Sequence, residues 1–172
     1  ELYTGADEAP TDVLTTPDGG ALITGIRITE PVREAFLIKL AADGTLLWDR
    51  SYRTEFVSVG FTAIAPLGSD GYMVATSTYL LGMDLSGNIL WQRGYSSGQA
   101  LIFQQIVPIG PNSFLALGST VPQPPEPGAI LALLVDQTGN PLDARQYTAG
   151  PANSMASTAM VHPDGAITIV GQ

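Results

Sequence analysis

Residue types that perform chemistry are scarce in this chain. His162 is the only histidine and there are no cysteines, which excludes thiolate zinc sites, cysteine nucleophiles and disulfides and disfavours any transition-metal site. Ser154, His162 and Asp164 carry the groups of a hydrolase triad, but a triad is recognised by geometry and roles rather than by sequence position. His162 directly precedes a turn sequence, so we expect it to flank a turn. We predict no catalytic residue and no enzymatic activity.

Carboxylates are the other chemically useful groups, and they occur mainly in turn sequences, where Asp bonds its own backbone. The conspicuous ones are Asp7, Glu8, Asp43, Asp49, Asp84 and Asp136. Neither an Asp-x-Asp-x-Asp-Gly calcium loop nor a Gly-Lys-Ser phosphate loop is present. We therefore expect no cofactor, and a weak calcium site in the acidic turns stays open as an alternative.

Charge and hydropathy restrict the partners. The net charge of −9 repels phosphate backbones, so we expect no nucleic-acid partner. Lys39 is the only lysine, which excludes a polybasic membrane anchor. The longest apolar run, residues 129–135, is too short to cross a bilayer. Because the chain begins at Glu1 without a methionine or a signal-peptide pattern, we expect a removed leader or a longer parent protein.

Two kinds of turn sequence alternate along the chain, each between short β-prone runs. The first kind lies at residues 17–20, 69–71, 111–113 and 163–165, and the second at residues 43–45, 86–88 and 138–140. Asp-Gly and similar pairs supply the positive φ angles of tight hairpins. No window shows a sustained helical period. Both observations predict successive β-hairpins with almost no helix.

Aromatic residues repeat in step with the hairpins. Trp48 and Tyr52 recur as Trp91 and Tyr95, 43 residues on, and Tyr147 follows Tyr95 by 52. These intervals define a four-stranded unit of about 43 to 52 residues, the size of a propeller blade. The predicted fold is an all-β, β-propeller-like array of four-stranded antiparallel blades, with about three and a half blades in one domain. The expected units are 1–48, 49–91, 92–143 and an incomplete 144–172. We expect both tryptophans to pack between adjacent blades.

The segments 2–7, 16–25, 37–40 and 44–48 carry an Asp-Gly-Gly hairpin followed by a Gly-x-x-x-Trp hairpin. This pattern resembles the repeat of secreted bacterial β-propeller proteins, which implies an extracellular or cell-surface location. The second hairpin is also similar to the quinoprotein propeller motif. Asp84, Gly87 and Trp91 keep the Gly-to-Trp spacing, but the Asp-to-Gly spacing is one residue short, and Asp143 replaces the tryptophan in the third unit. The resemblance implies a fold and no catalytic residue.

The fourth unit stops at Gln172 and lacks a strand, which predicts an open edge beside Ile167 and Ile169. Three explanations remain open at this point. The chain is a fragment of a longer propeller, or it closes as an irregular four-bladed ring with residues 2–3 pairing into the last blade, or strands of neighbouring copies complete the blade in an oligomer or filament.

These features favour a non-catalytic binding or structural module that contacts proteins, copies of itself above all. The candidate interaction residues are Tyr3, Phe56, Tyr79, Phe103, Pro124, Pro125, Ile167 and Ile169, chosen from variable connections and from the unfinished blade. The alternative is a piece of a larger quinoprotein-like or glycoside-cleaving propeller enzyme with its active site elsewhere. A small-ligand receptor ranks last, because the expected first strands are apolar.

Overall fold

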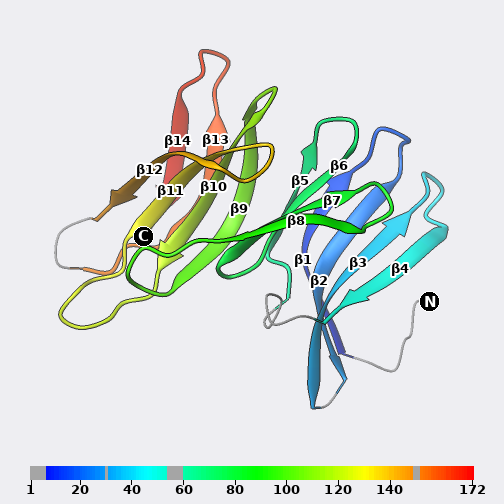
Figure 1. The fold of residues 1–172 in the computed structure, drawn as a ribbon, viewed down its shortest axis with the longest axis horizontal. Helices are drawn as coiled ribbons and strands as arrows, with labels where there is room; N and C mark the ends of the chain where they lie inside the picture. The colour runs from blue at the N-terminus through cyan, green and yellow to red at the C-terminus, as the bar shows by residue number, and fades with distance from the viewer. Residues whose placement is uncertain (1–6, 30, 54–59, 149–151) are drawn as a thin grey trace.

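The computed structural model describes residues 7–29, 31–53, 60–148 and 152–172. Every regular element in these ranges is a β-strand (Figure 1), which confirms the all-β prediction. The first sheet has the order β1 (Asp7–Thr15), β2 (Ala21–Thr29), β3 (Val32–Leu40) and β4 (Leu46–Tyr52). The second has the order β5 (Ala63–Leu67), β6 (Gly71–Ala75), β7 (Tyr79–Asp84) and β8 (Ile89–Gly94).

The remaining two sheets differ in size. The third contains β9 (Leu101–Gly110), β10 (Ser113–Thr120), β11 (Ile130–Asp136) and β12 (Pro141–Tyr147). The fourth contains only β13 (Ala156–Val161) and β14 (Ile167–Gly171). All strand pairs are antiparallel and join neighbours in sequence. Each sheet is therefore a meander, and the last one stops after a single hairpin.

The predicted hairpin turns are confirmed at both kinds of site. The first kind joins the first two strands of each sheet, and the second kind joins strands three and four of the three larger sheets. The second kind has one backbone pattern, in which the turn glycine donates its N–H to the carbonyl three residues earlier. Gly87 and Gly139 in these turns have φ of 80° and 76°, a region that is costly for other L-residues.

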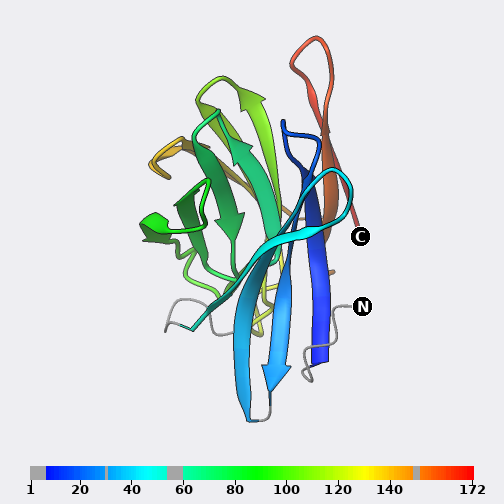
Figure 2. The same cartoon turned by 90° about the vertical axis from the view of Figure 1, so that its right-hand side faces the viewer.

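Successive sheets pack face to face, and their first strands are neighbours: β1 contacts β5, β5 contacts β9, and β9 contacts β13. One apolar core, including Leu37, Phe61 and Leu81, lies between the first and second sheets. A second core, including Phe103, Phe114 and Leu133, lies between the second and third sheets. Figure 1 shows the first sheet and the β13–β14 hairpin at opposite ends of this array, which Figure 2 views along its long axis.

The sheets follow the expected repeat with a small offset. They end at Tyr52, Gly94 and Tyr147, a few residues beyond the expected unit ends at 48, 91 and 143. The offset arises because Trp48 and Tyr52 belong to the same fourth strand, so the strand continues past the tryptophan. The array shows repeated antiparallel sheets, and none of them closes on itself.

Candidate interaction surface

Three side chains occupy alternate positions along the fourth strand of each larger sheet or directly after it. Side chains at alternate positions of an extended chain face the same way. The first triplet is Trp48, Arg50 and Tyr52; the second is Trp91, Arg93 and Tyr95; the third is Asp143, Arg145 and Tyr147. The first two triplets contact the following sheet. The third lies on β12, beside the two-stranded sheet.

The first triplet closes over the turn between β7 and β8. The Tyr52 hydroxyl donates a 2.7 Å hydrogen bond to the carbonyl oxygen of Gly87, and Arg50 Nη1 donates one of 2.8 Å to Asn88 Oδ1. A Cβ placed on Gly87 would lie 2.6 Å from the Tyr52 hydroxyl and 3.3 Å from the Trp48 ring. Burial of the hydroxyl raises the pKa of Tyr52 to about 12. The turn is thus held by all three side chains.

The second triplet repeats this arrangement on the turn between β11 and β12. The Tyr95 hydroxyl donates to the carbonyl oxygen of Gly139, and Arg93 Nε donates a 2.8 Å bond to the carbonyl oxygen of Thr138. A Cβ on Gly139 would lie 2.7 Å from the Trp91 ring. Burial also raises the pKa of Tyr95 to about 12. These contacts confirm that both tryptophans pack between successive sheets.

The two turns that are held in this way have the sequence Asp-x-x-Gly-Asn. The Asp84 carboxylate accepts hydrogen bonds from the backbone of Ser86 and from the backbone and side chain of Asn88. Asp136 accepts the same bonds from Thr138 and Asn140. Although burial acts in the opposite sense, these bonds lower the pKa of Asp136 to about 2. The carboxylates fix the shape of the turn.

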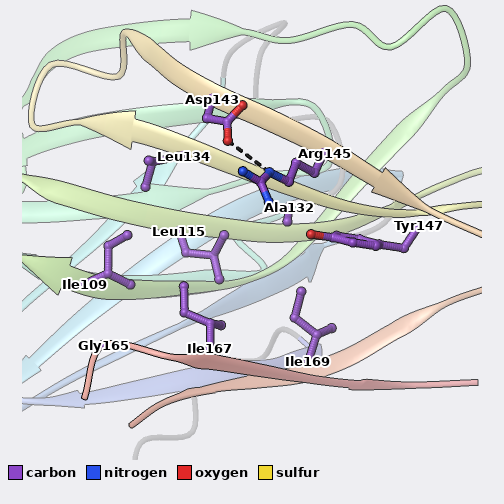
Figure 3. A pocket seen from close by; sticks show the side chains of 10 residues that line it. All are labelled: Ile109, Leu115, Ala132, Leu134, Asp143, Arg145, Tyr147, Gly165, Ile167 and Ile169. Carbon is purple, nitrogen blue, oxygen red and sulfur yellow. Dashed lines mark hydrogen bonds and ion pairs between the residues drawn. The ribbon is translucent and has the colours of Figure 1, made fainter. Parts of the chain in front are cut away.

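No turn within the described residues lies on the third triplet. The Tyr147 side chain is 46% exposed, against 9% for Tyr52, and Arg145 Nε forms a 3.1 Å ion pair with Asp143 on its own strand. A groove of about 350 Å³ extends from this triplet to β14 (Figure 3). Its apolar floor comes from Ile109, Leu115, Ala132, Leu134, Ile167 and Ile169.

The β14 strand borders the groove with an unpaired edge. His162 N–H donates to the carbonyl of Ala166, and Gln172 and Met155 exchange hydrogen bonds. Because bonding directions alternate along an antiparallel strand, the backbone groups of Ile167, Ile169 and Gly171 point away from β13. No described strand pairs with this edge. The side chains of Ile167 and Ile169 point into the groove (Figure 3).

The other predicted interaction residues do not line this groove. Tyr79 is half-buried and packs against the core between the first and second sheets. Pro124 and Pro125 are exposed in the connection between β10 and β11. Tyr3 and Phe56 lie outside the described residues.

The prediction that Phe103 lies in a connection between sheets, as an interaction residue, is corrected by the structure. Phe103 is 0% exposed and its ring meets that of Tyr95 edge to face at 5.7 Å. The error has a simple origin: β9 begins at Leu101, so Phe103 belongs to a strand and not to a connecting loop. Sequence reasoning used Tyr147 only as a marker of the repeat and missed Arg145, although the recurrence of Arg and Tyr at alternate positions after each second turn could have pointed to both as interaction residues.

The described residues contain little else that suggests chemistry. His162 Nε2 lies 2.8 Å from the Thr168 hydroxyl, next to its turn as expected. Within the described ranges, no three His, Cys, Asp or Glu side chains are grouped to hold a metal ion. The same ranges contain no helix with the length and apolar character to cross a membrane.

The fold places the chain in the class of all-β proteins with repeated antiparallel sheets. No protein-family model matches the chain, and no match to a curated protein was found. Among solved structures, the chain is similar to a protein of unknown function from Bacteroides caccae, with 14% sequence identity and a TM-score of 0.56. The similarity covers 78% of this chain and 46% of that one, so the chain spans about half the length of this structural relative. At this identity the likeness concerns the fold alone.

Proposed function

We propose that the chain is a non-catalytic, extracellular module of β-propeller type that works through protein–protein contacts, by accepting strands of another polypeptide on β14. The observation that carries this proposal is the unpaired β14 edge beside an apolar groove. The radial contacts among β1, β5, β9 and β13 support the propeller arrangement, in which first strands lie innermost. The resemblance of the sequence repeat to that of secreted bacterial β-propeller proteins supports the extracellular location.

Strand addition suits this edge for two reasons. Exposed backbone donors and acceptors form a template for another strand, and pockets beside the edge select its side chains. Ile167 and Ile169 already provide the floor of such a pocket. Two copies of the chain can also associate by strand addition, because two β14 strands can pair antiparallel about a two-fold axis and complete a four-stranded sheet.

Self-association tests the proposal. We expect sedimentation velocity and light scattering to show a reversible dimer that forms as the concentration rises, with the modest affinity of a small interface. Ile167→Pro removes one donor from the free edge and no bond to β13, so it should leave the fold intact and abolish the dimer. Ile167→Val keeps the donor and should still dimerise. A wild-type chain that stays monomeric at the highest soluble concentration would overturn the self-association.

A further inference from the structure

We propose that a cavity between the first and second sheets is a binding site for a small neutral molecule with several hydroxyl groups, a monosaccharide. The cavity has a volume of about 300 Å³, which is at the lower end of the range for small-molecule sites. Its lining residues belong to these two four-stranded sheets and their turns, and the two-stranded fourth sheet contributes none of them. The site therefore goes beyond strand addition and does not depend on the β14 edge.

Tyr72 brings to this cavity a hydroxyl without a partner. The residue lines the cavity and is only 4% exposed, yet no hydrogen bond joins its hydroxyl to another group of the described chain. Tyr52 and Tyr95, by contrast, each bond a glycine carbonyl. Since a buried tyrosine hydroxyl usually has a hydrogen-bond partner, a ligand in the cavity supplies the one that is missing here.

The repeat shows that this hydroxyl is not needed to fill the core. Tyr72 on β6 pairs with Pro66 on β5, and Phe114 on β10 pairs with Pro108 on β9 in the same way. Phe114 is 2% exposed and packs in the core between the second and third sheets. A phenylalanine ring is therefore sufficient at this place of the repeat, and the Tyr72 hydroxyl adds a polar group to the cavity.

The charged residues that line the cavity form one ion pair. Lys39 Nζ donates hydrogen bonds to Thr16 Oγ1 at 2.7 Å and to both Asp18 carboxylate oxygens at 2.9 Å. These three bonds use every proton of the ammonium group, so none is left for an anionic ligand. Asp18 Oδ1 also accepts from Thr16 and Gly20. Oδ2 accepts from Lys39 alone among the described residues, and its side chain is 57% exposed, so it can accept another bond.

These groups select a ligand that donates hydrogen bonds and carries no charge. Asp18 Oδ2 can only accept, whereas the Tyr72 hydroxyl can accept and donate. Burial, and then the charge of Asp18, raise the pKa of Tyr72, so this hydroxyl keeps its proton. Lys39 and Asp18 neutralise each other, so a charged ligand would lose hydration without gaining a counter-ion. Leu14 and Leu85 add apolar wall. A sugar ring, with hydroxyls at its edge and C–H groups on its faces, meets all these demands.

The probes are glucose, galactose and mannose, each titrated into the whole chain and followed by backbone amide NMR shifts. We expect at least one of them to bind one to one and to shift the amides of Ser69, Gly71 and Tyr72. Cyclohexanol is the matched control, because it keeps a six-membered ring and has a single hydroxyl. It should bind at least about tenfold more weakly, since it leaves the acceptors of the cavity unpaired.

Variants of the whole chain test the role of the hydroxyl. Tyr72→Phe should fold, as the place of Phe114 shows, and should weaken sugar binding by about three- to tenfold. Tyr95→Phe makes the same change outside the cavity and should leave sugar affinity unaltered. No shift with any of the three sugars at the highest soluble concentration would overturn the site. Cyclohexanol binding as tightly as the sugars, or unchanged affinity in Tyr72→Phe, would overturn the selection of hydroxyl groups. Strand addition survives either failure, because Ile167→Pro tests a different surface.

Discussion

The contact between a triplet and a turn glycine should be measurable as a difference between two alanine substitutions. Gly44 and Gly87 occupy equivalent turns with φ of 83° and 80°, so Gly44→Ala and Gly87→Ala incur the same backbone strain, about 1–2 kcal/mol. A Cβ on Gly44 meets nothing within 4 Å, whereas one on Gly87 lies 2.6 Å from the Tyr52 hydroxyl and 3.2 Å from Arg50 Cδ. Overpacking adds about 1–3 kcal/mol to Gly87→Ala alone.

Urea unfolding followed by tryptophan fluorescence provides the assay, because Trp48 lies on the affected turn. We expect Gly87→Ala to lower the free energy of unfolding by at least about 1 kcal/mol more than Gly44→Ala. Tyr52→Phe removes the nearest colliding atom, so in that background the excess should shrink by roughly 0.5–1 kcal/mol. Equal costs for the two alanine variants, or an excess that does not respond to Tyr52→Phe, would refute the triplet contact.

Three further perturbations follow from the described contacts. Phe103→Ala empties a fully buried site and should cost about 3–5 kcal/mol of unfolding free energy in urea titrations. Lys39→Met removes the Nζ that lies 2.7 Å from Thr16 Oγ1 and 2.9 Å from both Asp18 oxygens. Hydrogen bonds from Thr16 and Lys39 hold the pKa of Asp18 well below its usual value, so carboxyl NMR titration of the variant should find this pKa raised; an unchanged value would contradict the pairing. Asp136 has its pKa lowered from 3.8 to about 2 by hydrogen bonds within its turn, which outweigh burial. Its stabilising effect is therefore present above about pH 4 and lost as the pH falls towards 2, so the stability difference between wild type and Asp136→Asn should vanish across that range.

The local part of the fold was predictable because turn chemistry is local. A glycine after Asp, Ser or Thr, or the Pro-Asn-Ser sequence at residues 111–113, specifies a hairpin between β-prone residues without reference to the rest of the chain. The four first-kind and three second-kind turns were placed correctly on this basis. Unit ends were less accurate, since Trp48 and Tyr52 mark positions within a strand and not its boundary.

Exposure was harder to predict, because it depends on the neighbouring sheet. Phe103 follows a Ser- and Gly-containing stretch and reads as part of a loop, yet its alternation with Leu101 places it in the core between two sheets. Tyr147 shows the opposite case. Its chemical equivalents Tyr52 and Tyr95 are covered by the following sheet, whereas Tyr147 is 46% exposed among the described residues, which its sequence position does not reveal.

Two surfaces of the described array, the Gly44 turn and the third triplet, bear on how copies of the chain can meet. A head-to-tail filament would place the Gly44 turn of one copy under the third triplet of the next, and such contacts continue without limit. The Gly44 turn lacks the Asp and Asn that both held turns possess, so these end surfaces are poorly matched. Pairing of two β14 edges uses the same surface twice and ends with two copies. Light scattering should therefore level off at a dimer, and a mass that keeps rising with concentration would show that the Gly44 turn is accepted after all.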